Sequence, residues 1–241
     1  MKKIIICLII IFTPLLVRAD GHASKESSLV GEGAFNTLHV KAKNIDKYLT
    51  NLKSNTSTFK AIGADAAGTC VTHSGNNYQG EMFVWTAFSN IASAQHASTL
   101  YNPITDASFQ REKLRKVMYS VTWKPLKPFK LNPGYERVFR MKVAPENINN
   151  FVLVMTELES AIIASGYDTF NLGVFQPIGG GVHESQTLKI RAILDSAKES
   201  GQLMDDFFSG ASWSSLWLKA RMISEITSDT VEICEQIYTA D

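Results

Sequence analysis

The spacing of apolar residues along the chain predicts alternating strands and helices. Leu38, Val40 and Ala42 alternate with polar neighbours at a period of two, which is typical of a half-buried strand. The following segment has apolar residues at helical spacing, and Gly63 is suited to end that helix. The elements predicted for the first half are a strand at 34–43, a helix at 44–62, strands at 66–73 and 78–88, helices at 90–100 and 107–116, and a strand at 118–123.

The second half of the chain repeats this order. Its predicted elements are a strand at 136–143, a helix at 146–165, strands at 169–175 and 186–194, helices at 196–208 and 213–221, and a strand at 226–238. A short pattern also recurs 104 residues further on: Ala107-Ser108-Phe109, Leu114-Arg115, Met118 and Ser120 return as Ala211-Ser212-Trp213, Leu218-Lys219, Met222 and Ser224. Because this spacing is too long for a solenoid repeat, it indicates a tandem duplication of a whole domain.

The order strand, helix, strand, strand, helix, strand is that of a ferredoxin-like domain. Each such sheet is covered by helices on one face and needs a partner for the other. We therefore expect an α+β protein with two tandem ferredoxin-like domains, at 33–124 and 134–241, joined by a Pro-rich linker at 125–133. Their antiparallel sheets would pack face to face as an internal pseudo-dimeric α/β barrel with a cavity between the sheets, so the chain would be a monomer.

The N-terminus has the pattern of a secretory signal. Lys2 and Lys3 precede an apolar run of about 14 residues, and Val17-Arg18-Ala19 offers small or apolar residues where a signal peptidase reads. We predict a signal peptide at 1–19 and a flexible leader at 20–32, and hence a periplasmic or secreted protein with no membrane segment after cleavage. A retained N-terminal anchor is the alternative.

Composition excludes some partners and leaves the cysteines open. The net charge is +1, and the sequence has no basic patch of the kind that binds nucleic acid. No group of His, Cys and carboxylate residues has metal-ligand spacing, and no nucleophile motif is present. Removal of the signal leaves Cys70 and Cys234, which are either a disulfide or two buried thiols.

One local run resembles a known family. Val84-Trp85-Thr86-Ala87-Phe88-Ser89-Asn90, followed by Ala94-Gln95-His96-Ala97-Ser98, is similar to the dimeric α/β-barrel superfamily, and within it to antibiotic-biosynthesis-monooxygenase-like domains. In that family a tryptophan-bearing third strand leads into a helix that carries Ala-His. The second half departs from the pattern, since Arg191 lies near the tryptophan position. The resemblance therefore implies one active site rather than two.

Strand alternation predicts which side chains face the cavity between the sheets, because residues two apart share a face. The predicted cavity residues are His39, Phe83 and Trp85 from the first half and Arg140, Lys189 and Arg191 from the second. An aromatic wall opposite a cationic wall suits an anionic, conjugated small molecule. Alternatively, the cations pair with Glu81, Glu136 or Glu232 and only stabilise the interface.

Two histidines are candidates for acid–base chemistry. His39 would lie in the cavity and can exchange a proton near neutral pH, although a strand histidine is more often structural. His96 is a candidate through the family resemblance. In the haem-degrading branch of that family a strand tryptophan distorts the porphyrin and a helix histidine ligates iron, roles that would fall to Trp85 and His96. The rest of that pattern is not evident, so we expect no cofactor, with haem as the alternative.

The resemblance also implies a pairing for the cysteines. In this superfamily the second strand of one domain lies beside the fourth strand of the other, which is where Cys70 and Cys234 fall. We therefore expect a Cys70–Cys234 disulfide that joins the two halves.

Three functions fit these expectations. The chain is a monooxygenase-like enzyme without a cofactor, a binding protein that uses the same cavity without chemistry, or a structural or interaction protein whose barrel is filled. The fold alone does not choose among them. The choice depends on whether His39, Trp85, Arg140 and Arg191 line one open cavity.

Overall fold

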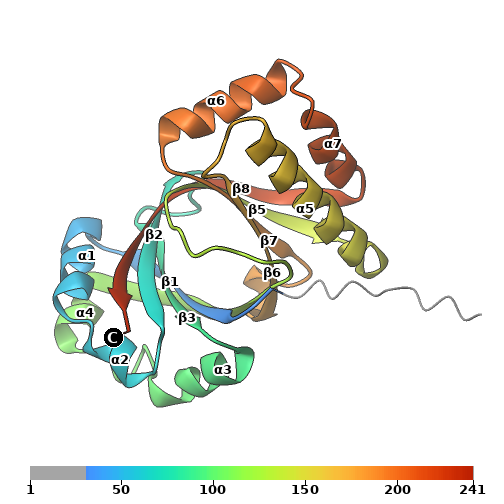
Figure 1. The fold of residues 1–241 in the computed structure, drawn as a ribbon. Helices are drawn as coiled ribbons and strands as arrows, with labels where there is room; N and C mark the ends of the chain where they lie inside the picture. Colours follow the sequence, from blue (N-terminus) through green and yellow to red (C-terminus); the bar gives the residue numbers. More distant parts are fainter. Residues whose placement is uncertain (1–30, 241) are drawn as a thin grey trace, which may run out of the picture.

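The structure of the protein is a computed structural model that describes residues 31–240. In this part of the chain eight antiparallel strands form one closed barrel, in the order β1-β3-β2-β8-β5-β7-β6-β4. Helices α1 to α4 lie outside one half of the barrel and α5 to α7 outside the other (Figure 1). The predicted signal peptide and residues 20–30 of the predicted leader lie outside the described residues.

The first half contains four strands in the order β4-β1-β3-β2. Polar side chains begin two of its helices: Asn44 accepts from the backbone N–H of Lys47, and Ser108 accepts from that of Arg111. The elements are β1 (Ala34–Ala42), α1 (Ile45–Ser54), α2 (Ser57–Ala61), β2 (Ala66–Ser74), β3 (Glu81–Phe88), α3 (Ile91–Leu100), α4 (Phe109–Leu114) and β4 (Arg115–Pro125).

The second half has the corresponding strand order β8-β5-β7-β6. Its longest helix, α5, buries Phe151, Met155, Leu158 and Ile162 at helical spacing against the outer face of the sheet. The elements are β5 (Tyr135–Val143), the 3-10 helix η1 (Pro145–Asn147), α5 (Ile148–Ala164), β6 (Asn171–Gly179), the 3-10 helix η2 (Gly181–His183), β7 (Leu188–Leu194), α6 (Ala197–Phe208), α7 (Ser214–Met222) and β8 (Ser224–Thr239).

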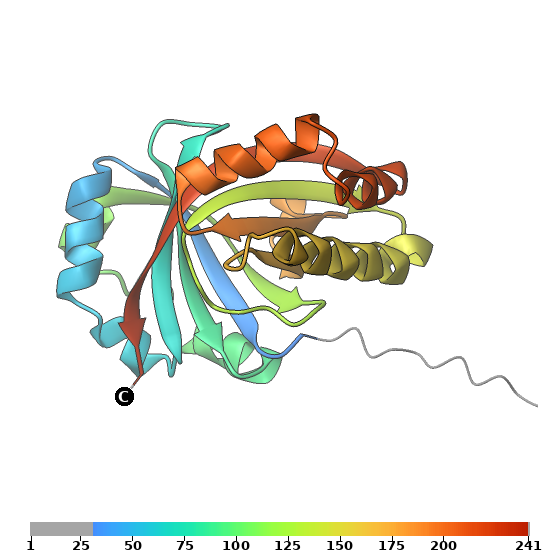
Figure 2. The same cartoon turned by 45° about the horizontal axis from the view of Figure 1, so that its top comes forward.

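Two strand pairings close the barrel, β2 with β8 and β4 with β6. Strand β8 is long enough to pair with β5 through its first part and with β2 through its second, so it runs past both halves (Figure 2). Cys70 of β2 lies opposite Cys234 of β8, and the structure joins them by a disulfide. The α+β fold predicted from the sequence, with two ferredoxin-like halves in one α/β barrel, is confirmed.

Strand alternation places the side chains as the sequence predicts. Val40 and Val84 contact the core under the helices, whereas Phe83 and Trp85 contact a separate cluster inside the barrel.

The loop between β4 and β5 contains no helix or strand, but it contacts the barrel. Lys127 in this loop is buried and donates to Glu159 at 2.6 Å and to the backbone O of Leu172 at 2.8 Å.

Two details differ from the sequence prediction. The helix expected at 44–62 is divided into α1 and α2, because the side chain of Asn55 accepts from the N–H and the hydroxyl of Ser57 and competes with helical hydrogen bonds. The recurring sequence pattern also does not map onto equivalent structure along its whole length. Met118 lies in strand β4, whereas Met222 is the last residue of helix α7.

No helix of the described residues is both long and apolar enough to cross a lipid bilayer.

Candidate functional site

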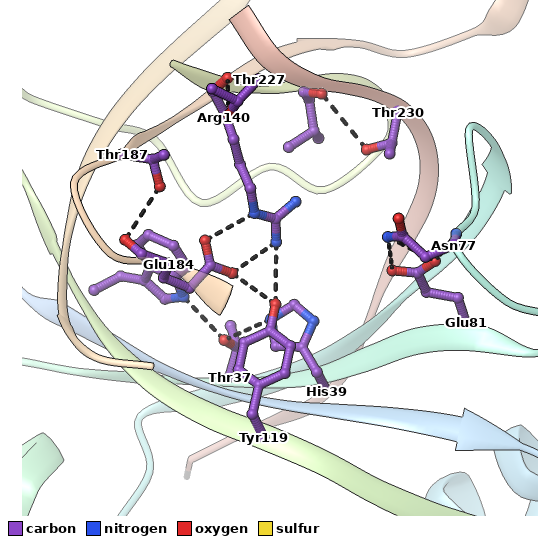
Figure 3. Close-up of polar contacts among 12 residues, drawn as sticks. Thr37, His39, Asn77, Glu81, Tyr119, Arg140, Glu184, Thr187, Thr227 and Thr230 are labelled. Carbon is purple, nitrogen blue, oxygen red and sulfur yellow. Dashed lines mark hydrogen bonds and ion pairs between the residues drawn. The ribbon is translucent and has the colours of Figure 1, made fainter. Parts of the chain in front are cut away.

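The polar groups at one end of the barrel form a connected cluster around Glu184 (Figure 3). Glu184 lies in the loop between β6 and β7 and is fully buried. Its two carboxylate oxygens accept from Arg140 Nε and Nη2, each at 2.7 Å, and the Tyr119 hydroxyl donates to it at 2.6 Å. Burial alone would raise the pKa of Glu184, but the hydrogen bonds and charge of Arg140 hold that pKa below its usual value. Arg140 is therefore neutralised by an ionised carboxylate.

His39 lies below this cluster and is enclosed. Its ring stacks on Tyr119 at 4.1 Å between ring centres, and His183 stacks on the other face of Tyr119 at 4.2 Å. The Thr37 hydroxyl accepts from Trp123 Nε1 at 2.9 Å, which leaves it able to donate to His39 Nε2 at 3.2 Å. Burial, assisted by the charges of Lys189 and Arg140, holds the pKa of His39 well below 6.5. The imidazole is neutral at pH 7 and only 3% exposed.

Lys189 lies deeper in the barrel, against aromatic rings. Its Nζ lies 4.1 Å from the centre of the Phe83 ring, a cation–π contact. No carboxylate lies within ion-pair distance of Lys189 in the described part of the chain. Burial is the main reason why its pKa is lowered to about 8.

Arg191 lies at the seam between the two halves. It forms an ion pair with the buried carboxylate of Glu136, and its Nη2 lies 3.3 Å from the sulfurs of both Cys70 and Cys234. Burial, together with the nearby charge of Glu232, raises the pKa of Glu136, and Arg191 opposes this shift. Among the described residues, Cys70, Glu136 and Cys234 are the one group close enough to share a metal ion, but the disulfide occupies both sulfurs.

These side chains occupy the interior where the sequence predicts a ligand cavity between the sheets. The space left beside Trp85, Trp123 and Lys189 that is open to the centre of a water molecule is about 10 Å³. That is room for about one water. His39, Phe83, Trp85, Arg140, Lys189 and Arg191 do converge on the interior, as predicted, but each arginine is paired with a carboxylate. Arg191 pairs with Glu136, one of the carboxylates that the pairing alternative names, whereas Arg140 pairs with Glu184, which it does not name.

His96 is not part of this cluster. It lies on an exposed face of α3, outside the barrel, whereas Trp85 is buried inside it on the other face of the sheet. A haem that contacts both residues would have to pass through the strands. The two residues therefore do not fit the haem site that the resemblance suggested.

A cavity beside the first sheet lies outside the barrel, under the helices of the first half. This first-half cavity has a volume of about 340 Å³. Apolar side chains from the sheet and from α1 to α3 line most of it, namely Leu38, Leu52, Phe59, Ile62, Val84 and Ala97. Polar side chains also line it, among them Tyr101, Arg111 and Arg115. Alternation predicted that this face of the sheet is apolar but gave no sign that a cavity remains there.

The second half has an equivalent but different space between its helices and sheet. This second-half cavity measures about 190 Å³ and is lined almost entirely by apolar and aromatic side chains, including Phe139, Ile190 and Trp213. Its one charged lining residue, Arg137, donates to both carboxylate oxygens of Asp229, at 3.1 and 2.6 Å. The two halves thus offer cavities of different polarity.

Sequence reasoning missed several residues of the barrel cluster. Tyr119 could have been found, because it alternates with Val121 and Trp123 along the predicted strand. Glu184 and His183 carry no such signal, since they lie in a loop whose path depends on the rest of the fold. Arg111 and Arg115 were also missed, because a basic residue near a helix end usually faces solvent.

Comparisons with known proteins identify the fold. No family of known proteins matches the sequence, and no curated protein is similar to it at a significant level. Among solved structures, an anthrone oxidase-like protein is 9% identical with a TM-score of 0.54, and the match covers 89% of this chain and 98% of that one. A "putative monooxygenase" from Lactobacillus acidophilus NCFM is 8% identical with a TM-score of 0.56, over 87% and 96% of the two chains.

A third similar structure is a mutant chlorite dismutase from Candidatus Nitrospira defluvii in complex with cyanide. It is 7% identical with a TM-score of 0.52, over 89% of this chain and 96% of the other. At such low identity these matches establish the shared α/β-barrel fold and its full-length extent. They do not transfer an activity.

Proposed function

We propose that this protein binds a small conjugated molecule in the first-half cavity. The observation that carries this proposal is a cavity of about 340 Å³ between the helices and the first sheet, whereas the pocket inside the barrel beside Trp85 and Lys189 measures about 10 Å³. A cavity of this size, with a largely apolar lining and a few charged and polar groups, has the composition of ligand sites in general. The ligand is therefore assigned to the outside of the barrel.

Export and a monomeric state belong to the same proposal. The N-terminal pattern supports a periplasmic or secreted location, and the closed barrel supports a chain that needs no second copy. The repeated order of elements supports an origin by tandem duplication. The different lining of the two cavities is then the result of divergence between the halves.

A second candidate is a monooxygenase-like enzyme that acts in the same cavity. The observation that favours it concerns Tyr101, which lines the cavity. Its hydroxyl is buried and has no hydrogen-bond partner among the described residues. Such a hydroxyl can exchange a hydrogen bond or a proton with a bound molecule. The names of two similar structures point to the same class of chemistry. His39 has no place in this mechanism, because it does not line the cavity.

Binding of two aromatic probes tests the proposed site. We would titrate 2-naphthoate and 2-naphthamide into the purified protein by isothermal calorimetry. Val84→Phe places a larger side chain in the first-half cavity and should weaken binding at least tenfold, because the added ring occupies the ligand's volume. Ile190→Phe is the matched control, since Ile190 holds the equivalent strand position in the second-half cavity.

Thermal unfolding would show that both variants remain folded. The proposal fails if neither probe binds to the unaltered protein. It also fails if Ile190→Phe weakens binding as much as Val84→Phe does.

A further inference from the structure

We propose that the ligand of the first-half cavity carries a negative charge, in the form of a carboxylate on an apolar body, and that Arg111 and Arg115 bind it. This inference rests on the proposed function and specifies the class of ligand. It is carried by two buried arginines that line the cavity and have no acidic partner in the described part of the chain.

The two arginines are buried and lack acidic partners. Arg111 and Arg115 are each only 6% exposed. Neither has a carboxylate within ion-pair distance among residues 31–240, whereas the largely buried cations Lys127, Arg140 and Arg191 each have one. Lys189 shares this lack, but it lies inside the barrel against aromatic rings and does not line the cavity. A buried charge is costly unless an opposite charge or strong hydrogen bonds compensate it. An anionic ligand would supply that compensation.

The present partners of the two arginines are all neutral. Arg115 donates from Nη1 to the Tyr48 hydroxyl at 2.5 Å and from Nη2 to the backbone O of Pro103 at 3.0 Å. Burial raises the pKa of Tyr48 above 10.0 despite the opposing charge of Arg115, so this phenol adds no negative charge at pH 7. These bonds use two of the five N–H donors of the guanidinium.

Arg111 is held more loosely. Its guanidinium donates to the side chains of Asn51 at 3.3 Å and Thr58 at 3.4 Å, and to the backbone O of Asn55 at 3.5 Å. Distances this long are at the weak end for N–H···O hydrogen bonds. A carboxylate could therefore replace some of these contacts with shorter, charge-assisted ones.

Tyr101 also lines the cavity. Its hydroxyl is buried and has no hydrogen-bond partner among residues 31–240, an arrangement that costs free energy until a partner is supplied. A carboxylate held by the arginines has a second oxygen that can accept from this hydroxyl. One carboxylate in this cavity would thus supply the negative charge that Arg111 and Arg115 lack and the acceptor that the Tyr101 hydroxyl lacks.

The rest of the cavity defines the body of the ligand. Its apolar lining extends from Leu38 and Val84 on the sheet to Phe59 and Ile62 on the helix side. A ligand that is charged throughout, such as a phosphorylated sugar, would leave these surfaces in contact with polar groups. The chemistry that fits is an amphipathic monocarboxylate with a ring system or short chain.

A matched pair of probes tests the charge of the ligand. 2-Naphthoate is ionised at pH 7, whereas 2-naphthamide has nearly the same shape and no charge. We expect the carboxylate to bind at least tenfold more tightly, because hydrogen bonds to charged groups are the stronger kind. Affinities that are equal, or a tighter amide, would overturn the inference while leaving the cavity as a ligand site. If neither probe binds, the proposed function fails as well.

Three variants assign the preference to residues. Arg111→Met and Arg115→Met should each reduce the preference for 2-naphthoate about tenfold, and Tyr101→Phe should reduce it a few-fold. Arg137→Met is the control, since Arg137 lines the second-half cavity and is already paired with Asp229. A preference that survives in both cavity arginine variants, or is lost in Arg137→Met, would contradict the assignment. Circular dichroism checks that each variant is folded. The comparison of the two probes on the unaltered protein does not depend on any variant.

Discussion

Glu184 shows how a single side chain can take the place that a ligand was expected to fill. The sequence placed Arg140 in the barrel as a candidate for binding an anion, and the structure supplies that anion from the chain itself. A carboxylate that is fully buried needs hydrogen-bond and ion-pair partners, because an isolated charge in the interior would be strongly unfavourable. The forked contact with Arg140 and the hydrogen bond from Tyr119 meet this need.

Replacement of Glu184 should therefore destabilise the fold. Glu184→Gln removes the charge and leaves Arg140 buried without a counterion, at a cost of about 3 kcal/mol in the free energy of unfolding. Asp229→Asn is the control, because Asp229 pairs with Arg137 near the surface, where such a pair contributes about 1 kcal/mol or less. Urea denaturation at pH 7 measures both. Equal losses in the two variants would show that burial of Glu184 is not the determining factor.

The effect of Glu184→Gln should depend on pH in one direction. Folding lowers the pKa of Glu184 below its usual 4.5, so the ionised carboxylate contributes its full stability above about pH 4.5. That contribution is lost as the pH falls through the lowered pKa of the folded state. The difference in unfolding free energy between the unaltered protein and the variant should accordingly shrink below pH 4.5.

At the scale of elements, the loop between β6 and β7 determines whether one end of the barrel interior is covered. Gly179, Gly180 and Gly181 all adopt positive φ angles, which turn the chain back so that Glu184 enters the end of the barrel. A Cβ atom on Gly180 would lie 2.9 Å from Glu184 Cγ and 3.2 Å from Val121 Cβ, whereas one on Gly179 would meet nothing within 4 Å. The path of the loop and the position of Glu184 are thus coupled.

This coupling can be measured with two alanine substitutions. Both Gly179→Ala and Gly180→Ala should lose about 1 kcal/mol of stability from the positive φ angle. Gly180→Ala should lose at least a further 1 kcal/mol, because its Cβ displaces the Glu184 side chain from Arg140. Chemical denaturation of the two variants gives the comparison. Similar losses would mean that the loop adjusts without moving Glu184.

At the scale of the whole molecule, two seams hold the halves together, and the disulfide lies on one of them. Cys70 and Cys234 are 164 residues apart in sequence and join β2 to β8. A cross-link over such a long loop restricts the unfolded chain strongly. The other seam, between β4 and β6, depends on strand pairing and packing.

Loss of the disulfide should lower stability without a change of fold. Cys70→Ser with Cys234→Ser should reduce the free energy of unfolding by about 5 kcal/mol in the chain-entropy description. Reductant should destabilise the unaltered protein and have no effect on the double variant. Thiol counting on the denatured chain expressed without residues 1–19, which contain Cys7, provides the check. Two free thiols in the absence of reductant would show that the bond does not form.

Local information in the sequence was enough for the order of elements and for the faces of the strands. Periodicity is a property of neighbouring residues, so the alternation around Val84 and Trp85 already separated the helix side from the barrel side. The same alternation brought His39, Arg140, Lys189 and Arg191 to one interior. The helix break at Asn55 was missed because it depends on one side-chain hydrogen bond.

Only the tertiary structure decided where space remains. Whether the barrel is hollow depends on the fit of side chains from all eight strands, and on a loop carboxylate whose partner, Arg140, lies 44 residues away. Arg111 and Arg115 became candidates in the same way, through burial against residues distant in sequence and because no carboxylate of residues 31–240 forms an ion pair with them. The sequence by itself determined the scaffold and the interior residues, because these follow from local patterns. The position of the candidate ligand site was decided by long-range packing, which no local pattern encodes.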